Sequence, residues 1–262
     1  MQVRDAMSRD ILKVGPGDSA LETGLMMDSR HISAALVLEK GRLRGIVSKE
    51  TFIAHMSKLC ERPLESLTVS DFMEADIDTV KEDADIKVAV ELLLMQNSII
   101  DRLPVLSEGE VVGLISKADF TRLFAEEMAG KYRVADLMQY SPVTVADYTP
   151  LAQVVDEMMN LGVKRVIVLS GEKLAGIISV KDLSLMLFRE KVVCKGTDPM
   201  PHLTAEDAMT RNPITVNKKA HASEAAGVMV GRGIGGIPVV NNRLEGILTR
   251  TDLLKGYQLS LG

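Results

Sequence analysis

The chain contains no tryptophan, only two cysteines and few aromatic side chains, which make up 3% of its 262 residues. A hydrophobic core must therefore be built mainly from Val, Ile, Leu, Ala and Met, and the 15 methionines are most simply explained as adaptable core side chains. Nucleic-acid-binding proteins usually carry a basic stripe, often interleaved with aromatic residues. Neither is present in a chain of net charge −5 without long runs of like charge, which disfavours binding to a polynucleotide.

Long apolar runs are also absent. No stretch approaches the ~20 residues that are needed to cross a bilayer. The N-terminal residues MQVRDAMSRD contain no hydrophobic run that could serve as a signal peptide. We therefore expect a cytoplasmic protein that does not enter the membrane.

Residues that bind metals or catalyse reactions do not form recognisable groups. Cys60 and Cys194 have the spacing of neither a zinc site nor a redox motif, and the sequence leaves open whether they pair. The histidines lack a metal-ligand partner three or four residues on; they are His31, His55, His202 and His221. No nucleophile and base are recognisable together, so nothing indicates an enzyme.

What the sequence does contain is a unit of about 65 residues, present four times. Each copy opens with Asp-x-Met, namely DAM (5–7), DFM (71–73), DLM (136–138) and DAM (207–209). Each later reaches Gly-apolar-apolar-Ser/Thr, in GIVSKET from Gly45, GLISKAD from Gly113, GIISVKD from Gly176 and GILTRTD from Gly246. We divide the chain into repeats 1–66, 67–130, 131–200 and 201–262, with linkers at 57–68 and 189–204.

The pattern within a copy predicts its secondary structure. A short extended piece comes first, as in 79–83, 143–147 and 214–218. A helix follows, because residues 89–97 and 152–160 place apolar side chains on one face. Two apolar runs separated by a polar turn predict a hairpin, and a last helix begins at the Ser/Thr. The fold class is therefore α/β (α+β), with four tandem β-α-β-β-α repeats, and we expect the first to pair with the second and the third with the fourth.

Four such units resemble the CBS-domain family, named after cystathionine β-synthase. The Asp-x-Met openings, the RLPV strand at 102–105 and the Gly-apolar-apolar-Ser/Thr-x-x-Asp endings carry the resemblance, which covers nearly the whole chain. It implies that paired repeats form a Bateman module with two clefts, and that two modules form a flat disc. This arrangement is similar to the energy-sensing γ subunits of AMP-activated kinases. The ligands implied are AMP, ADP, ATP or S-adenosylmethionine.

The Ser/Thr-x-x-Asp endings have two interpretations. In a capping box, the hydroxyl and the acid satisfy free backbone N–H groups at a helix start. The same helix start also suits a phosphate, and the strand glycine allows backbone to approach closely. The resemblance assigns the acid to ribose and the hydroxyl to phosphate, in the pairs Ser116 and Asp119, Ser179 and Asp182, and Thr249 and Asp252.

The first copy departs from this pattern, because Thr51 stands where the acid should be, after Ser48. A threonine accepts only weakly from a ribose, and Glu50 is expected to point away from that face. We predict that the first cleft is empty or binds something else.

Cations return at two places, beside the last helix start and before the second strand. A phosphate on an acidic protein needs such local cations, although each could equally be a solvated surface side chain. The candidates are Arg102, Lys117, Lys164, Arg165 and Arg250, with Lys13 and Lys49 in the first copy. The opening strands should line the adenine end, and the candidates there are Thr79, Thr144 and Thr215, with Pro104 and Pro238 at the cleft edge and Ile167 at that place in the third copy.

The stretch GRGIGG (231–236) matches the Gly-x-Gly-x-x-Gly of dinucleotide sites. Such a fingerprint follows a strand and opens a helix, whereas this one ends a helix and precedes the strand IPVV. We therefore reject it and expect these glycines to let the loop fold tightly against the cleft.

The resulting prediction is a non-catalytic sensor that binds an adenosine-containing ligand and uses no cofactor. The alternative is a scaffold or regulatory subunit of a separate enzyme, with vestigial ligand sites. An enzyme acting on nucleotides is disfavoured, because no base, nucleophile or metal cluster is evident. The sequence identifies neither the adenosyl ligand, nor the partner, nor whether two chains associate as a homodimer.

Overall fold

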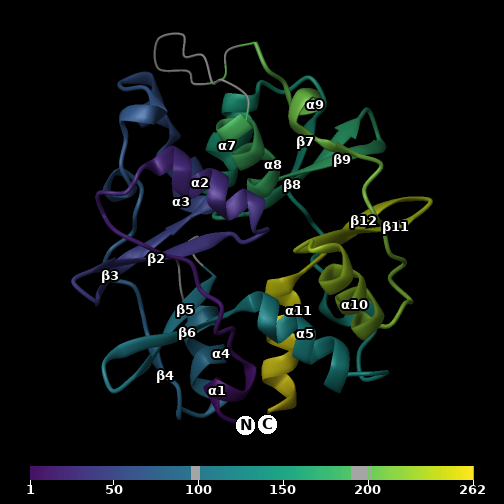
Figure 1. Ribbon diagram of the computed structural model, residues 1–262. Helices are drawn as coiled ribbons and strands as arrows, with labels where there is room; N and C mark the ends of the chain where they lie inside the picture. Colours follow the sequence, from purple (N-terminus) through teal and green to yellow (C-terminus); the bar gives the residue numbers. More distant parts are fainter. Residues whose placement is uncertain (96–100, 190–199, 201, 262) are drawn as a thin grey trace.

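The computed structural model describes the chain except for residues 96–100, 190–199, 201 and 262 (Figure 1). Each repeat has the predicted β-α-β-β-α order, although the opening strand of the fourth is reduced to an isolated bridge between Val216 and Val239. A short helical turn formed by the Asp-x-Met segment precedes each repeat.

The centre of each repeat is an antiparallel hairpin that leads directly into a helix. The hairpins are β2 (Ala34–Glu39) with β3 (Arg42–Ser48), β5 (Arg102–Ser107) with β6 (Glu110–Ser116), β8 (Arg165–Ser170) with β9 (Lys173–Ser179), and β11 (Gly236–Asn241) with β12 (Arg243–Thr249). The helices that follow them are α3 (Lys49–Ala54), α5 (Lys117–Glu127), α8 (Val180–Arg189) and α11 (Arg250–Ser260). The second hairpin turns through Glu108 and Gly109, both with positive φ, as tight hairpin turns require.

The opening strands are shorter than predicted and pair in parallel with the first hairpin strand. They are β1 (Lys13–Val14), β4 (Val80–Lys81) and β7 (Thr144–Ala146). The helices between opening strand and hairpin are α2 (Ala20–Ser29), α4 (Ile86–Met95), α7 (Leu151–Asn160) and α10 (Ala222–Arg232). Each repeat therefore forms a small sheet with helices packed against it.

The Asp-x-Met segments dock on the partner repeat. They are α1 (Val3–Ala6), the 3₁₀ turn η3 (Val69–Asp71), α6 (Val134–Leu137) and α9 (Ala205–Ala208). Val3 N donates to the carbonyl of Ala84 in repeat 2, and Val69 N donates to Asp18 in repeat 1. The same exchange joins repeats 3 and 4, where β10 (Thr210–Arg211) also pairs with β9. The predicted pairing, first with second and third with fourth, is confirmed.

The Asp-x-Met segment of one repeat meets the strand glycine of its partner repeat across each pair. A Cβ on Gly45 would overlap the carbonyl oxygen of Glu74, which follows DFM, and a Cβ on Gly246 would overlap that of Gln139, which follows DLM. A Cβ on Gly176 would lie 2.6 Å from Met209 Sδ. The strand glycines therefore do allow close approach, and the group that approaches is the opening segment of the partner repeat.

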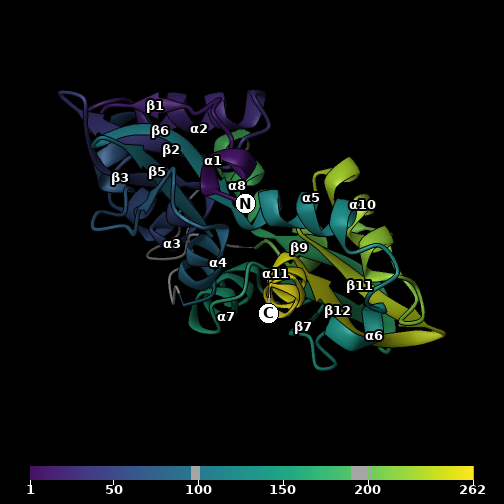
Figure 2. The same ribbon diagram turned by 90° about the horizontal axis from the view of Figure 1, so that it is seen from below.

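The two pairs form a four-part disc. Figure 1 shows repeat 1 above repeat 2 on one side and repeat 3 above repeat 4 on the other. One hydrophobic core joins repeats 1 and 3, and a second joins repeats 2 and 4. Figure 2 shows α5, α10 and α11 together where the second core lies. The expected disc of two modules is therefore confirmed.

Several of the few aromatic side chains lie where the modules meet. Phe52 of α3 packs edge-on against Phe188 of α8, with ring centroids 4.8 Å apart, and also contacts Phe72. In the other core, Phe120 of α5 contacts Tyr257 of α11. Large buried rings contribute strongly to packing energy, so these contacts favour a fixed disc.

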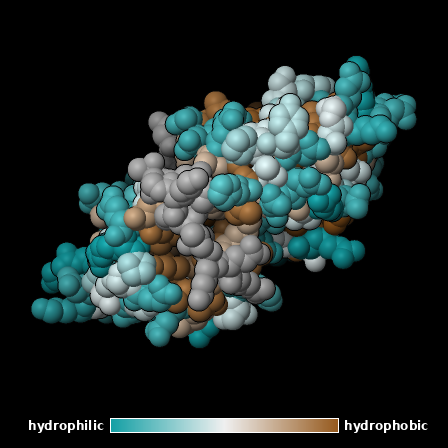
Figure 3. Space-filling view, turned by 90° about the horizontal axis from the view of Figure 1, so that it is seen from above, coloured by the Kyte–Doolittle hydropathy of each residue, from teal (hydrophilic) through white to brown (hydrophobic). Residues whose placement is uncertain are grey.

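The segments predicted as linkers are only partly described. Residues 57–68 include most of one 3₁₀ helix, η1 (Met56–Cys60), and all of a second, η2 (Leu64–Ser66), and Leu67 is buried. Most of 189–204 lies outside the described residues, as does Cys194, so the cysteine pairing is not described. Seen from above, hydrophobic atoms gather near the middle of the molecule, beside the atoms drawn in grey (Figure 3). None of the described helices has the length and apolar character of a membrane span.

Candidate functional site

The polar starts of the last helices converge at the centre of the disc. Equivalent positions follow from the hairpin register, in which the helix-capping residue pairs with the first residue of the hairpin. These pairs are Ser48 with Ala34, Ser116 with Arg102, Ser179 with Arg165, and Thr249 with Gly236. Side chains from all four repeats touch there, because Glu50 binds Arg102 and Lys164 while Lys117 Nζ donates to Thr251 Oγ1 at 3.2 Å.

The predicted capping boxes are present in the three repeats that carry the acid. Ser116 N donates to Asp119 Oδ2 at 2.8 Å, and Ser116 Oγ donates to the same oxygen at 2.8 Å. Ser179 and Thr249 make the same two bonds to Asp182 and Asp252. One oxygen of each acid therefore serves the helix cap.

The other oxygen of each acid accepts from the partner repeat. Asp119 Oδ1 accepts from Ser8 Oγ at 3.2 Å, Asp182 Oδ1 from Thr210 Oγ1 at 3.0 Å, and Asp252 Oδ1 from Gln139 Nε2 at 3.0 Å. These three donors follow Asp-x-Met directly, and the sequence prediction missed them. The signal was a polar residue after every Asp-x-Met, but its partner depends on the exchange of segments between repeats.

In repeat 1, the residues equivalent to the serine and the acid are buried and bond to each other. Thr51 Oγ1 accepts from Ser48 N and donates to Ser48 O, both at 2.9 Å. Ser48 is 0% and Thr51 1% exposed, whereas Asp119 and Asp182 are half-buried. Asp252 is also almost inaccessible, with an exposed fraction of 3%. Repeats 2 and 3 therefore present the accessible acids.

The side chain of Glu50 takes part in a central ion-pair network that the sequence analysis did not anticipate. Glu50 points into the centre, where its Oε1 lies 3.1 Å from Lys164 Nζ and 3.4 Å from Arg102 Nη2. Asp101 binds the same two cations, at 3.0 Å from Lys164 Nζ and 2.7 Å from Arg102 Nη2. Arg102 is only 6% exposed, so it is not a solvated surface cation. Two cations predicted to meet phosphate are thus paired with carboxylates in this structure.

Lys49 at the start of α3 is a second buried cation. Its Nζ lies 3.7 Å from Asp28 Oδ1, and its side chain is 5% exposed. Burial lowers the pKa of Lys49, and Asp28 opposes that change. The first copy therefore also neutralises its central lysine internally.

In the central network, attraction by neighbouring cations affects the pKa values of the carboxylates more than burial does. Burial alone would raise the pKa of Asp101, but Lys164 and Arg102 hold it well below its usual range. Glu50 behaves in the same way, because attraction by Lys164 and Arg102 outweighs burial and lowers its pKa. Both acids are therefore ionised at neutral pH.

Acid should weaken the fold through these two groups. A carboxylate whose pKa is lower in the folded state stabilises the fold above its unfolded pKa, about 4, and this contribution disappears as the pH falls through the folded value. We expect the free energy of unfolding, measured by urea titration, to fall between about pH 5 and pH 2. Asp101→Asn should show a shallower fall, and equal slopes in the two proteins would contradict this assignment.

Arg165 and Arg250 form the opposite case, because they are adjacent cations without an acid. Arg165 lies against the backbone of repeat 4, where a Cβ on Gly236 would come 2.7 Å from Arg165 Cδ. Within the described part of the chain, no residue hydrogen-bonds or ion-pairs with Arg165. Arg250 Nη2 donates to Ile234 O at 3.2 Å, while its Nε is buried with no partner among the described residues.

The pKa shifts of Arg165 and Arg250 also indicate that these two cations lack a counter-charge. Burial and the charge of Arg250 lower the pKa of Arg165 to about 10. Burial also lowers the pKa of Arg250 and of nearby Lys117. An anion placed here would relieve this repulsion and accept the free N–H groups. The glycines of 231–236 were expected to fold tightly against a cleft, and Gly235 and Gly236 make room for the Arg165 side chain.

The opening-strand candidates lie beside their predicted edge residues. Thr144 pairs with Ile167 in the sheet. Val80 pairs with Val105, which sets Thr79 beside Pro104, and the bridge from Val216 to Val239 sets Thr215 beside Pro238. Thr144 and Thr215 are exposed, and the two prolines are buried. The structure thus brings each threonine to its edge residue, and their role in binding adenine stays a prediction.

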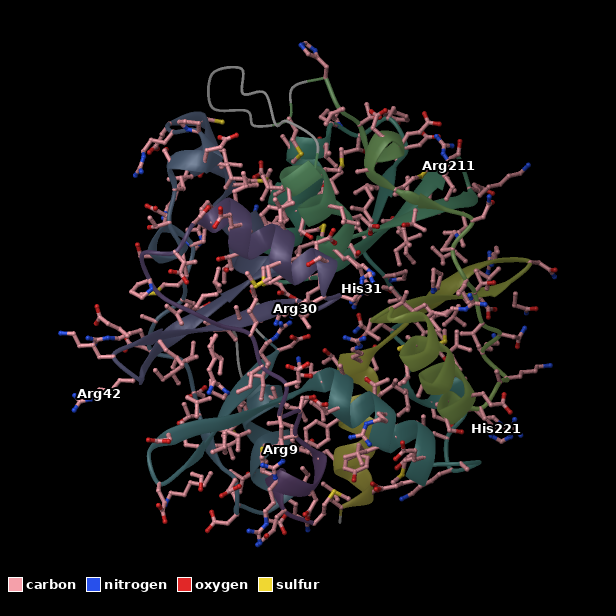
Figure 4. All side chains as sticks on the ribbon, in the orientation of Figure 1. Arg9, Arg30, His31, Arg42, Arg211 and His221 are labelled. Atoms are coloured by element: carbon pink, nitrogen blue, oxygen red, sulfur yellow. The ribbon has the colours of Figure 1, made fainter. Side chains whose placement is uncertain are left out.

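The described residues show no group of three or more His, Cys, Asp and Glu side chains that could hold a metal. Figure 4 shows Arg30 and His31 near the middle of the molecule, whereas Arg42, Arg211 and His221 lie toward its edges. His31 and His221 therefore do not form a common site.

Known proteins place this geometry in a family. The CBS domain model matches residues 3–58, 69–126, 134–188 and 205–258. Protein MJ1225 of Methanocaldococcus jannaschii is 28% identical over 196 residues, covering 72% of this chain and 69% of that protein. A 33.4 kDa protein of Thermofilum pendens is 25% identical over 244 residues, covering 86% and 79%. Part of an inosine-5′-monophosphate dehydrogenase of Thermoplasma acidophilum is 31% identical over 112 residues, covering 42% and 21%.

Two solved structures share the whole fold. The structure of MJ1225, described as a proposed archaeal homologue of g-AMPK, superimposes with a TM-score of 0.88 at 22% identity, covering 98% of this chain and 100% of that one. A protein of Pyrococcus horikoshii has a TM-score of 0.66 at 22% identity, covering 98% and 99%. Because the four family matches together cover most of its length, this chain belongs to the CBS domain family.

Proposed function

We propose that this protein is a non-catalytic regulatory protein that binds an adenosine-containing ligand, AMP, ADP, ATP or S-adenosylmethionine, at the centre of its disc. The observation that carries the proposal is the half-buried pair Arg165 and Arg250, which has no acid partner within the described chain. Unpaired buried charges are costly unless something compensates for them. An anionic ligand group is the simplest compensation.

The neighbouring groups suit the rest of such a ligand. Arg165 pairs in register with Ser179, the cap of α8, so a phosphate at the arginine would also meet a helix start. Asp182 is half-buried and already accepts a hydroxyl from Thr210, as it would from a ribose. We therefore place the main site at repeat 3, with Asp119 of repeat 2 as a second site. The first cleft, closed by Ser48 and Thr51, does not bind ribose.

The relatives support a regulatory role. MJ1225 is described as a proposed homologue of g-AMPK, and a dehydrogenase carries a segment similar to this chain. A separate enzyme is therefore a reasonable partner, whose activity would respond to ligand binding. A ligand changes the arrangement of the disc only if it binds one arrangement more tightly than another.

Ligand binding should raise the melting temperature. At a ligand concentration about 100 times the dissociation constant, the stabilisation is about 2.7 kcal/mol. For a chain of this size that corresponds to about 5–10 °C. The measurement is a thermal-shift panel with AMP, ADP, ATP and S-adenosylmethionine, in which at least one ligand should produce this shift.

A matched pair of variants separates binding from capping. Asp182→Asn weakens both the cap and the ribose contact, and we expect it to reduce the ligand shift. Asp207→Asn weakens an equivalent but exposed cap in α9, where Asp207 accepts from Thr204 N at 2.7 Å, and it should keep the shift. The absence of a shift with every ligand in the unaltered protein would refute the proposal.

The scaffold alternative has weaker support. Exposed apolar side chains occur on α2, where Leu25 is 41% exposed, and on α10, where Val230 is 44% exposed. Figure 1 places these helices in opposite quarters of the disc, so they do not form one continuous surface. Singly exposed apolar residues are normal in soluble proteins.

A further inference from the structure

Equivalent arginines of the two modules have opposite surroundings. Arg102 and Arg165 hold the same register position, each opposite the serine that caps the following helix. Arg102 faces the carboxylates Glu50 and Asp101, whereas Arg165 faces the guanidinium of Arg250. One module therefore supplies its own counter-ion, and the other does not.

Glu50 is the residue that makes this difference. It is the second residue of α3, and the other repeats carry Ala118, Lys181 and Thr251 at that place. Its side chain is 8% exposed, although a carboxylate is expensive to bury. Its Oε2 is buried without a hydrogen-bond partner among the described residues. A role in capping does not explain an acid here, because Thr51 already completes the cap.

Within the network, Glu50 holds the cations less closely than Asp101 does. Its contacts with Arg102 and Lys164 are 3.4 and 3.1 Å, against 2.7 and 3.0 Å for Asp101. A phosphate offers three acceptor oxygens to the same cations, whereas Glu50 uses only one of its two oxygens. Glu50 is thus the member that competes directly with a ligand phosphate.

We propose that Glu50 is an internal counter-ion that occupies Arg102 and Lys164 in place of a ligand phosphate, and so restricts the centre of the disc to ligands with few negative charges. The identity of the natural ligand rests on the proposed function, but the charge restriction does not. The Arg165 and Arg250 pair remains for one anionic group, and each further phosphate that reaches across the centre meets Glu50. Like charges held close together in a buried site repel strongly.

The test compares simple anions of different charge. Inorganic orthophosphate and tripolyphosphate are titrated by calorimetry into the unaltered protein, Glu50→Gln and Glu22→Gln. Glu22 is an exposed first-turn acid of α2, so its variant carries the same change of net charge away from the centre. For Glu50→Gln, we expect affinity for tripolyphosphate to rise about tenfold more than affinity for orthophosphate. Glu22→Gln should leave the ratio of the two affinities unchanged.

Glu50→Thr, which introduces the residue found in repeat 4, provides a second variant if the glutamine protein folds poorly. An unchanged affinity ratio in the Glu50 variants, or no binding of either anion to any of the proteins, overturns the proposal. If adenosine ligands stabilise the unaltered protein but the ratio stays constant, the counter-ion role fails and the proposed function stands. If the ratio rises although no adenosine ligand binds, the counter-ion role stands and the proposed function fails.

Discussion

Arg102→Ala is expected to lower the free energy of unfolding by about 3–5 kcal/mol. The change removes a partner of two carboxylates, the buried Glu50 and the largely buried Asp101, and leaves Lys164 as their one remaining close cation in the described network. It also frees Ser33 Oγ, which accepts from Arg102 Nη1 at 3.0 Å. Uncompensated buried charge is the main physical cause. Chemical unfolding in urea at neutral pH measures the loss.

Arg211→Ala is the matched control for this prediction. Arg211 also forms an ion pair, with Glu206 at 2.9 Å, but the two side chains are 60% and 53% exposed. Exposed pairs contribute about 0–1 kcal/mol, so this variant should unfold almost as the unaltered protein does. Similar losses in both variants would show that the central network is no more important than a surface pair.

Arg165→Met should have effects of opposite sign on stability and on binding. Removing one of two adjacent guanidinium groups relieves their repulsion, so the ligand-free protein should become more stable by about 1 kcal/mol. The anion site loses a principal donor at the same time, so affinity for the adenosine ligand should fall about 100-fold. Calorimetric titration and urea unfolding of the same preparation measure both effects.

Arg243→Met serves as the control, because Arg243 is an exposed arginine at the turn between β11 and β12. Both its stability and its ligand affinity should stay close to those of the unaltered protein. If Arg165→Met instead destabilises the chain and keeps full affinity, the arginine is a structural element of the repeat 3–4 contact. Replacing a purely structural arginine would not raise the free energy of unfolding and lower the ligand affinity at the same time.

Much of the fold was predictable because the signals are local. The helix expected at 152–160 is observed as α7, Leu151–Asn160, and the polar turns fall where the hairpins reverse. The opening strands are shorter than expected because their pairing is limited to a few residues, as in β4, Val80–Lys81. Hydrophobic periodicity marks the presence of an element more reliably than its ends.

The site was predictable only where one repeat builds it alone. The Ser/Thr-x-x-Asp caps were found because both partners lie three residues apart. The donors Ser8, Gln139 and Thr210 were missed because they reach their acids through segments exchanged between repeats. The ion pairs of Glu50 were missed for a related reason, since its partner Lys164 lies in another module. Which cations stay unpaired depends on contacts between repeats, and no single repeat encodes them.

The exchange of opening segments also bears on how the chain folds during its synthesis. Val3 must wait for Ala84 to leave the ribosome, and Val134 for Ala220, before either segment can dock. A nascent first repeat would meanwhile expose the surface that η3 later covers. We infer that the smallest cooperative folding unit is a pair of repeats. A ribosomal pause after the second repeat would leave a tethered half-disc, whose apolar surface is not yet covered by repeats 3 and 4.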